Sequence, residues 1–273
     1  MATLRPLPFV LVASNHGTLI VNRNDYRMVD SNRGYGVGYQ ILNTGSFDPQ
    51  EVGFVTALLT ARRTGFGDGV VAVDCGANIG VHTVEWAKHI HGWGRVIAFE
   101  AQERIYYALA GNIAINNCLN AMAHWAAVGS ESRQIRIPVP DYQVPSSFGS
   151  LELKEGKNEF IGQQIDYSDA ATQAIEQKTI DSLGLDRMDL VKIDVEGMEL
   201  DVLEGARETI ARCKPVMVIE IIKTDAAAVN ALLKKWGYQI FPLGINILAV
   251  HDSDPTLTMI SFKDGNLTLN IRR

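Results

Sequence analysis

Short apolar runs alternate with longer amphipathic stretches along the middle and the end of the chain. The short runs are continuous, as expected of strands buried on both faces, and the stretches between them have helical periodicity. The pattern predicts strands at 70–73, 95–99, 121–128, 190–193 and 216–219, and helices at 79–90, 103–116, 198–212 and 225–236. This order indicates βαβ units with right-handed crossovers, and therefore a mostly parallel α/β sheet. Two last strands, at 238–242 and 246–250, are too close for a crossover helix, so at least one should be antiparallel.

The first part of the chain has a different pattern. Two apolar runs, 9–13 and 18–21, flank a polar turn and predict a β-hairpin. Asp48, Pro49 and Glu51 have the spacing of a capping box at the start of a helix that runs to about residue 63. We therefore expect residues 1–66 to form a hairpin-and-helix addition, acting as a lid or an oligomerisation surface, on a domain of residues 67–273. Between the strands of that domain, residues 130–178 are polar and irregular, with one strand expected at 134–139.

Composition narrows the class of protein. The chain has 273 residues, of which 47% are hydrophobic and 21% charged, which is typical of a globular enzyme-sized domain. A net charge of −6 gives no electrostatic reason to expect a nucleic-acid partner. The three cysteines lack metal-ligand spacing and favour a reducing compartment. Because no apolar run approaches the roughly 20 residues of a membrane span, we expect a cytoplasmic protein without a membrane span.

Acidic residues close four of the predicted strands. They are Asp74, Glu100, Asp194 and Glu220. In parallel sheets, ligands bind beyond the carboxyl ends of the strands, so these carboxylates should meet along one edge of a binding site.

The loop after the first strand of the sheet is rich in glycine. It runs Asp74-Cys75-Gly76-Ala77-Asn78-Ile79-Gly80, which is neither the G-x-G-x-x-G of a dinucleotide site nor a P-loop. This spacing argues against a nicotinamide cofactor and against ATP. Glu100 lies 26 positions after Asp74, where a carboxylate can accept hydrogen bonds from both ribose hydroxyls of a nucleoside. The plainer alternatives are a tight βα turn and a solvated acid at a strand end.

Three ordered motifs carry a resemblance to a known family. They are Val73–Gly80, Ile97-Ala98-Phe99-Glu100 and Val191–Glu199, followed by Leu203–Ala206 and Pro215–Glu220. Together they resemble the FkbM family of methyltransferases over roughly residues 70–222. The resemblance implies a class I methyltransferase (Rossmann-like) fold and S-adenosylmethionine (SAM) as the methyl donor. It also implies cofactor contacts from Asp74, Gly76, Ala77, Asn78, Gly80, Glu100, Ala101, Gln102, Ala127 and Asp194. The family usually has proline after the acid that closes the second strand, where this chain has Ala101-Gln102.

Candidate chemistry centres on carboxylates. Asp194 and Glu196 are two positions apart, so an extended backbone would point both to one face, and Glu220 should come from the neighbouring strand. Such a cluster can raise one pKa and create a general base, or it can bind a divalent cation that orients the acceptor. Helix capping is the alternative for Glu196. His82 is a further candidate base, with simple packing as its alternative.

The acceptor site is expected in the segments outside the motifs. Tyr35 and Tyr39 belong to a glycine-rich stretch that can form a mobile lid. Ser147 and Phe148 lie in the long 130–178 insertion and are further substrate-contact candidates. The leading hypothesis is O-methylation of a small-molecule or sugar hydroxyl. The alternatives are N-methylation, protein methylation, and a non-catalytic nucleoside-binding or assembly protein.

Overall fold

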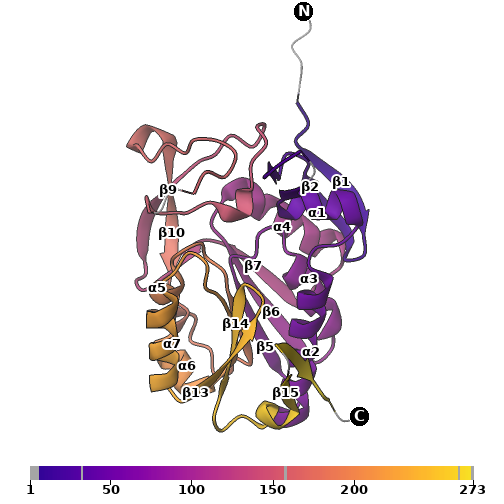
Figure 1. The fold of residues 1–273 in the computed structure, drawn as a ribbon, viewed down its shortest axis with the longest axis vertical. Helices are drawn as coiled ribbons and strands as arrows, with labels where there is room; N and C mark the ends of the chain where they lie inside the picture. Colours follow the sequence, from indigo (N-terminus) through magenta and orange to yellow (C-terminus); the bar gives the residue numbers. More distant parts are fainter. Residues whose placement is uncertain (1–5, 32, 157–158, 264, 272–273) are drawn as a thin grey trace, which may run out of the picture.

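A seven-stranded sheet forms the centre of the molecule. The computed structural model describes residues 6–31, 33–156, 159–263 and 265–271. The strand order is β13-β14-β12-β11-β5-β6-β7 (Figure 1). These strands are β5 (Val70–Cys75), β6 (Gly94–Glu100), β7 (Ala121–Trp125), β11 (Leu190–Ile193), β12 (Val216–Glu220), β13 (Tyr238–Leu243) and β14 (Asn246–His251). All neighbours are parallel except β14, which is antiparallel to both β12 and β13. The predicted mostly parallel sheet with an antiparallel strand near the C-terminus is confirmed.

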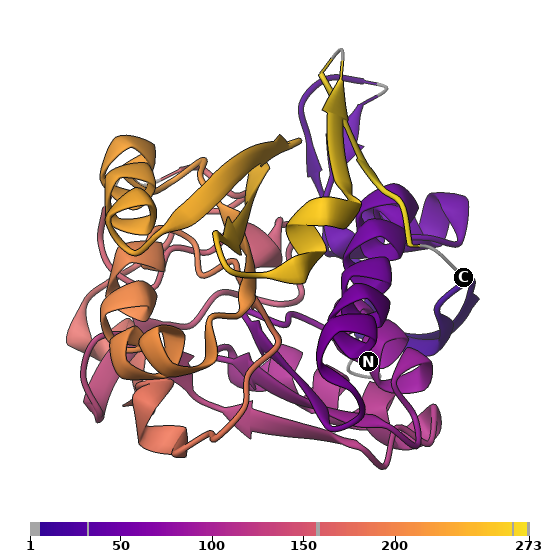
Figure 2. The same cartoon turned by 90° about the horizontal axis from the view of Figure 1, so that it is seen from below.

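Helices cover both faces of the sheet (Figure 2). One side carries α2 (Pro49–Phe66) and α3 (Val81–His89), and the other carries α5 (Glu199–Glu204), α6 (Arg207–Cys213) and α7 (Ala226–Lys235). Alternate residues of β5 point to opposite sides, so Val70 packs with the α2 and α3 side chains while Val73 packs toward α5 and α7. The helix α4 (Glu103–Ile115) connects β6 to β7. The sheet is thus buried on both faces, as its continuous apolar strands predict.

The helix predicted at 198–212 is broken into α5 and α6. At the break, Gly205 lies so close to the backbone of Gly129 that any side chain on it would overlap the Gly129 carbonyl oxygen. The Asp181 carboxylate then accepts hydrogen bonds from the backbone N–H groups of Glu208 and Thr209, at 3.1 and 2.8 Å, and so caps the first turn of α6. Neither contact is local in sequence, which is why the pattern predicts one helix.

A second, three-stranded sheet was predicted only in part. The strand expected over 121–128 divides, because β8 (Ala127–Val128) leaves the main sheet and pairs in parallel with β10 (Thr172–Lys178). On its other side β10 pairs with β9 (Arg133–Pro138), which confirms the strand expected at 134–139. The strand β10 was not predicted from the sequence. Short 3₁₀ helices lie nearby at Phe148–Ser150 (η1), Asp169–Ala171 (η2) and Asp181–Leu183 (η3).

The N-terminal segment begins with the predicted hairpin, β1 (Phe9–Ser14) and β2 (Gly17–Asn22). It continues with β3 (Arg27–Met28), β4 (Gly34–Tyr35) and α1 (Val37–Thr44). The glycine-rich stretch suggested as a mobile lid is therefore a short strand and the start of a helix. Leu19 and Ile41 share an apolar cluster with Ile79 and Ile105 of the main domain. The N-terminal segment and the main domain therefore have a common core.

The capping box predicted at the start of α2 is wrong. Asp48 has a left-handed backbone, with φ of 34°, and its side chain forms no capping hydrogen bond. The Glu51 carboxylate instead accepts a hydrogen bond from the Asn246 side-chain amide at 2.8 Å, which draws it away from the helix end. The predicted helix itself is present, with Pro49 in its first turn.

The chain ends with η4 (Pro255–Met259) and the hairpin β15 (Ile260–Lys263) and β16 (Asn266–Leu269). The η4 helix contacts α2. Within the described residues, no helix is both long and apolar enough to cross a membrane.

Candidate functional site

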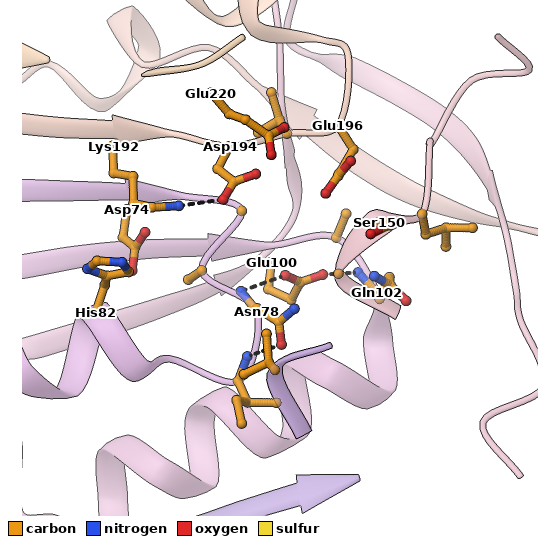
Figure 3. A pocket seen from close by; sticks show the side chains of 18 of the residues that line it. Asp74, Asn78, His82, Glu100, Gln102, Ser150, Lys192, Asp194, Glu196 and Glu220 are labelled. Carbon is orange, nitrogen blue, oxygen red and sulfur yellow. Dashed lines mark hydrogen bonds and ion pairs between the residues drawn. The ribbon is translucent and has the colours of Figure 1, made fainter. Parts of the chain in front are cut away.

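A cavity opens at the carboxyl ends of β5, β6, β11 and β12 and has a volume of about 250 Å³. Its floor brings together the four strand-end carboxylates, Asp74, Glu100, Asp194 and Glu220 (Figure 3). They converge because parallel strands end at the same edge of a sheet. The roof comes from β4, α1 and the 147–151 segment.

The loop from Asp74 to Gly80 wraps over the end of β6. The backbone N–H groups of Gly76 and Ala77 both donate to the carbonyl of Phe99, at 3.0 and 2.9 Å. A side chain on Gly76 would overlap the carbonyl oxygen of Asp194, and its φ of 81° is a conformation that glycine adopts readily. The loop therefore lies against the neighbouring β11 end and leaves the space above it open to a ligand.

Glu100 presents both carboxylate oxygens at the cavity wall. Oε2 accepts a hydrogen bond from the backbone N–H of Asn78 at 2.9 Å, and Oε1 accepts one from the backbone N–H of Gln102 at 2.8 Å. Burial raises the pKa of Glu100 to about 7, although these two hydrogen bonds lower it in part. Each oxygen keeps a second lone pair. The fixed carboxylate can thus accept hydrogen bonds from two neighbouring hydroxyl groups.

Beside Glu100 the wall is apolar. It is lined by Phe99, Ala101, Ala126, Ala127, Val128 and Leu153. Gln102 also borders the cavity, but its side chain is already engaged. Its Nε2 donates to the carbonyl of Phe148 at 2.8 Å, and its Oε1 accepts from the Tyr142 hydroxyl at 3.2 Å. Gln102 therefore fixes η1 in place, and the small side chains of Ala101, Ala126 and Ala127 form an apolar slot beside Glu100.

The carboxylates of Asp194, Glu196 and Glu220 form a cluster, with oxygens within 4.8 Å of one another. Two lysines pair with it: Lys192 Nζ is 2.6 Å from Asp194 Oδ2, and Lys223 Nζ is 2.6 Å from Glu196 Oε2. Sequence reasoning missed Lys223, because it lies beyond the end of β12 and belongs to no motif.

Glu196 does not serve as a helix cap. Its backbone has φ of 55°, and the Glu199 carboxylate holds this turn by accepting hydrogen bonds from the N–H groups of Val195 and Gly197, at 3.2 and 3.1 Å. The Glu196 side chain is thereby directed toward the cluster (Figure 3). Burial raises the pKa of Glu196 to about 9 and that of Glu220 to about 8, and the nearby Asp194 charge adds to both shifts.

The roof holds some, but not all, of the predicted acceptor contacts. Tyr35 and Ser147 line the cavity, whereas Tyr39 packs against Tyr26 and Phe148 is fully buried in the apolar cluster below. Three further lining residues had no sequence signal, because they lie outside every motif and outside the glycine-rich stretch. They are Gln40, Phe47 and Ile245.

A second group of ion pairs and hydrogen bonds, formed by Glu159 and Lys223, connects different parts of the cavity roof. Glu159 Oε1 accepts a hydrogen bond from the Tyr35 hydroxyl at 3.0 Å, and its Oε2 is 3.1 Å from Lys223 Nζ. Lys223 also donates to the carbonyl of Ser150 at 2.6 Å. One ammonium group therefore links the carboxylate cluster to two parts of the 130–178 insertion.

The sheet order, the glycine loop at the first strand and the acid closing the second define the class I methyltransferase fold. Residues 74–240 match the methyltransferase FkbM domain, and the chain belongs to that family. The chain is 26% identical to Methyltransferase 1 of Beauveria bassiana over 64% of this chain and 74% of that protein. It is 27% identical to methyltransferase sdnD of Sordaria araneosa over 62% of this chain and 73% of that protein.

The fold comparison includes a crystal structure from the same family. It is methyltransferase FkbM of Methylobacillus flagellatus, which is 19% identical, with a TM-score of 0.47. The match covers 79% of this chain and about half, 54%, of that longer chain.

Proposed function

We propose that this protein is a SAM-dependent O-methyltransferase that acts on a hydroxyl group of a small molecule or a sugar. The observation that carries the proposal is the Glu100 carboxylate, held by two backbone hydrogen bonds between an apolar slot and a glycine loop. Membership of the FkbM family supports methyl transfer as the activity and SAM as the donor.

The residues present fit the donor along its whole length. The alanine slot at Ala101 and Ala127 suits adenine, and the two free lone pairs of Glu100 suit the ribose hydroxyls. The loop of Asp74, Gly76, Ala77, Asn78 and Gly80 lies on the far side, where the methionine part would extend. Asp74 Oδ1 is buried and forms no hydrogen bond within the described residues, so it has capacity for a donor group such as an ammonium.

Charge balance gives the Asp194, Glu196 and Glu220 cluster a role. When bound, SAM supplies a methyl group on a positively charged sulfonium. The raised pKa values of Glu196 and Glu220 keep both carboxyls largely protonated near neutral pH in the free protein. A bound sulfonium favours their ionised forms, in which the three carboxylates exceed the two paired lysines by one negative charge. That charge complements a sulfonium and helps to hold it near the acceptor. Asp194 therefore serves both the donor site and the catalytic cluster.

The two lysines also bear on whether the carboxylate cluster binds a divalent cation. Because two lysine ammonium groups already occupy positions beside it, we expect methyl transfer to be unchanged by a chelator such as EDTA. Steady-state rates measured with EDTA, and again with added Mg²⁺, check this expectation. A rate that EDTA abolishes and Mg²⁺ restores would instead assign the carboxylates to a metal.

Donor binding should depend on pH through Glu100. Its raised pKa of about 7 means that the carboxyl is protonated below neutrality, whereas the ionised form is the better acceptor for two ribose hydroxyls. The titratable groups that interact electrostatically with Glu100 include Asp74 and Tyr142. We expect the Kd for the product S-adenosylhomocysteine (SAH) to rise below pH 7, by up to about tenfold per pH unit. Calorimetry between pH 5.5 and 8 measures this, and Glu100→Gln should flatten the profile.

Two measurements test the proposed function. Calorimetry should show that SAM and SAH bind, and transfer of a labelled methyl group should be detected with hydroxyl acceptors in a panel of phenols, alcohols and glycosides. Labelling of amines or proteins alone would favour the N-methyl or protein alternatives. Binding without transfer to any acceptor would favour the non-catalytic alternative, and no binding would refute the proposal.

The N-terminal addition has a place in this proposal. Residues 1–66 contribute Tyr35, Val37, Gln40 and Phe47 to the cavity roof. We assign this segment to acceptor binding, as a lid that is fixed to the domain by a shared apolar core. Swapping it for the corresponding segment of another family member should change which acceptor is methylated and leave SAH binding intact.

A further inference from the structure

The glycine-rich stretch before α1 packs closely on a turn formed by residues 22–25. A side chain on Gly36 would overlap the carbonyl oxygen of Asp25, and a side chain on Gly38 would overlap the carbonyl oxygen of Asn22. Glycine at these two positions therefore allows the backbone at the start of α1 to lie against the turn. The stretch has a packing function that its sequence pattern alone does not reveal.

The same turn also binds the insertion. The side-chain amides of Asn22 and Asn24 both donate to the carbonyl of Tyr142, at 3.0 and 3.3 Å. The backbone N–H of Ser146 donates to the carbonyl of Asn24 at 2.9 Å, and Ser146 forms a parallel β-bridge with Asp25. Two segments that are far apart in the sequence, the N-terminal addition and the insertion, are thus joined directly at this turn.

Asp25 lies at the centre of these contacts, with only 3% of its surface exposed. Its Oδ2 accepts a hydrogen bond from the backbone N–H of Gly38 at 2.9 Å, and its Oδ1 accepts one from the backbone N–H of Phe148 at 3.1 Å. Gly38 lies in the first turn of α1 and Phe148 begins η1, so one carboxylate caps both elements. Burial raises the pKa of Asp25 to about 6, and the two hydrogen bonds lower it in part, so the group is ionised at pH 8.

The two elements that Asp25 caps belong to opposite parts of the cavity roof. The first part consists of β4 and α1, and the second consists of η1 and its neighbours. They contribute Tyr35, Val37 and Gln40 from the first part, and Ser147, Ser150 and Leu151 from the second. Asp25 itself is not a lining residue. Its carboxylate therefore sets the distance between the two parts of the roof without touching a ligand.

We propose that Asp25 is a positioning residue for the methyl acceptor. By holding α1 and η1 together, it forms the acceptor side of the cavity before the acceptor binds, so that little binding free energy is used to order the roof. This inference rests on the proposed methyl transfer and on the assignment of the roof to the acceptor. It adds a residue outside the cavity to those that determine how well the acceptor is bound.

The activity test uses the acceptor with the highest rate in the labelled-methyl panel, at pH 8. Asp25→Asn keeps the shape of the side chain, but one of its two terminal atoms becomes an NH₂ group that cannot accept the N–H it faces. We expect the KM for the acceptor to rise by about tenfold, because binding must then also order the roof, while the Kd for SAH stays unchanged. The matched control is Asp166→Asn, since Asp166 accepts the N–H of Ser168 within an exposed turn of the same insertion.

Hydrogen exchange in the free protein tests the arrangement without donor or acceptor. In Asp25→Asn, exchange should be faster in peptides covering residues 36–41 and 146–151, and unchanged in a peptide covering β5. Asn24→Ala, which removes one of the two amide hydrogen bonds to Tyr142, should have the same effects to a smaller degree. It replaces Asp25→Asn in both tests if that variant does not fold.

The outcomes separate this inference from the proposed function. A folded variant that methylates the acceptor with its parent's KM overturns the inference and leaves methyl transfer intact. Equally faster exchange in β5 and in the roof also overturns it, because the change would then be a general loss of stability. If SAH binds but no acceptor in the panel is methylated, the proposed function fails and this inference fails with it.

Discussion

Replacing Glu100 by alanine is expected to raise the Kd for SAH by about 10²- to 10⁴-fold. The expected loss follows from two charge-assisted hydrogen bonds to the ribose, each worth about 1.5–3 kcal/mol. The carboxylate is fixed in advance by the N–H groups of Asn78 and Gln102, so no ordering is needed when the donor binds. Isothermal titration calorimetry at pH 8, where Glu100 is ionised, measures the change.

The control for this variant is Glu103→Ala. Glu103 is three residues away at the start of α4, where it bonds to the Tyr107 hydroxyl and does not line the cavity. The Glu103→Ala variant should bind SAH with the same Kd as the parent protein. Thermal melting without ligand shows whether Glu100→Ala is folded. A folded Glu100→Ala protein that binds SAH as tightly as Glu103→Ala would remove Glu100 from the donor site.

A second large effect is expected far from the cavity. Replacing Arg62 by methionine should lower the free energy of unfolding by about 3–5 kcal/mol, the usual loss when one partner of a buried ion pair is removed. Arg62 of α2 is buried and forms ion pairs with Asp189, at 3.4 Å, and with Asp254. Asp189 is also held by Arg187 at 2.8 Å, but the change leaves Asp254 without its arginine.

The neighbouring Arg63→Met gives a matched comparison. Arg63 forms an ion pair of 2.7 Å with Asp68, but both side chains are largely exposed, so the loss should be about 0–1 kcal/mol. Chemical denaturation of both variants measures the two values. Equal stability of Arg62→Met and Arg63→Met would show that the buried group contributes no more than a surface pair. Donor binding should be the same in both variants, because this network lies outside the cavity lining.

The parts of the site that follow from sequence are those fixed by strand ends. Asp74, Glu100, Asp194 and Glu220 each come directly after or at the end of an apolar run, and a parallel sheet places such residues together. The antiparallel strand β14 was predictable for a similar local reason, because the link from β13 is too short for a crossover. In these cases a pattern within a few residues determines the position in space.

The remaining features depend on contacts between distant segments. Glu51 has the sequence position of a cap, yet Asn246, 195 residues later, sets its direction. Lys223 reaches the carboxylate cluster, and Ile245 reaches the cavity, from loops that follow no period. The break between α5 and α6 depends on where Gly129 lies. Local propensity does not encode such contacts, and they are concentrated in the roof of the cavity.

The position of Lys223 has a consequence for the order and strength of ligand binding. Its ammonium group contacts Glu196 beside the proposed donor site, and it also contacts Glu159 and the Ser150 carbonyl in the insertion, which we propose covers the acceptor side. A ligand that changes the charge near Glu196 should therefore change the strength of the contacts between Lys223 and the insertion. Such energetic coupling is reciprocal, so the donor and the acceptor must alter each other's affinity by the same factor. Differences in acceptor preference within the family should then be accompanied by differences in donor affinity, even where the donor contacts are identical.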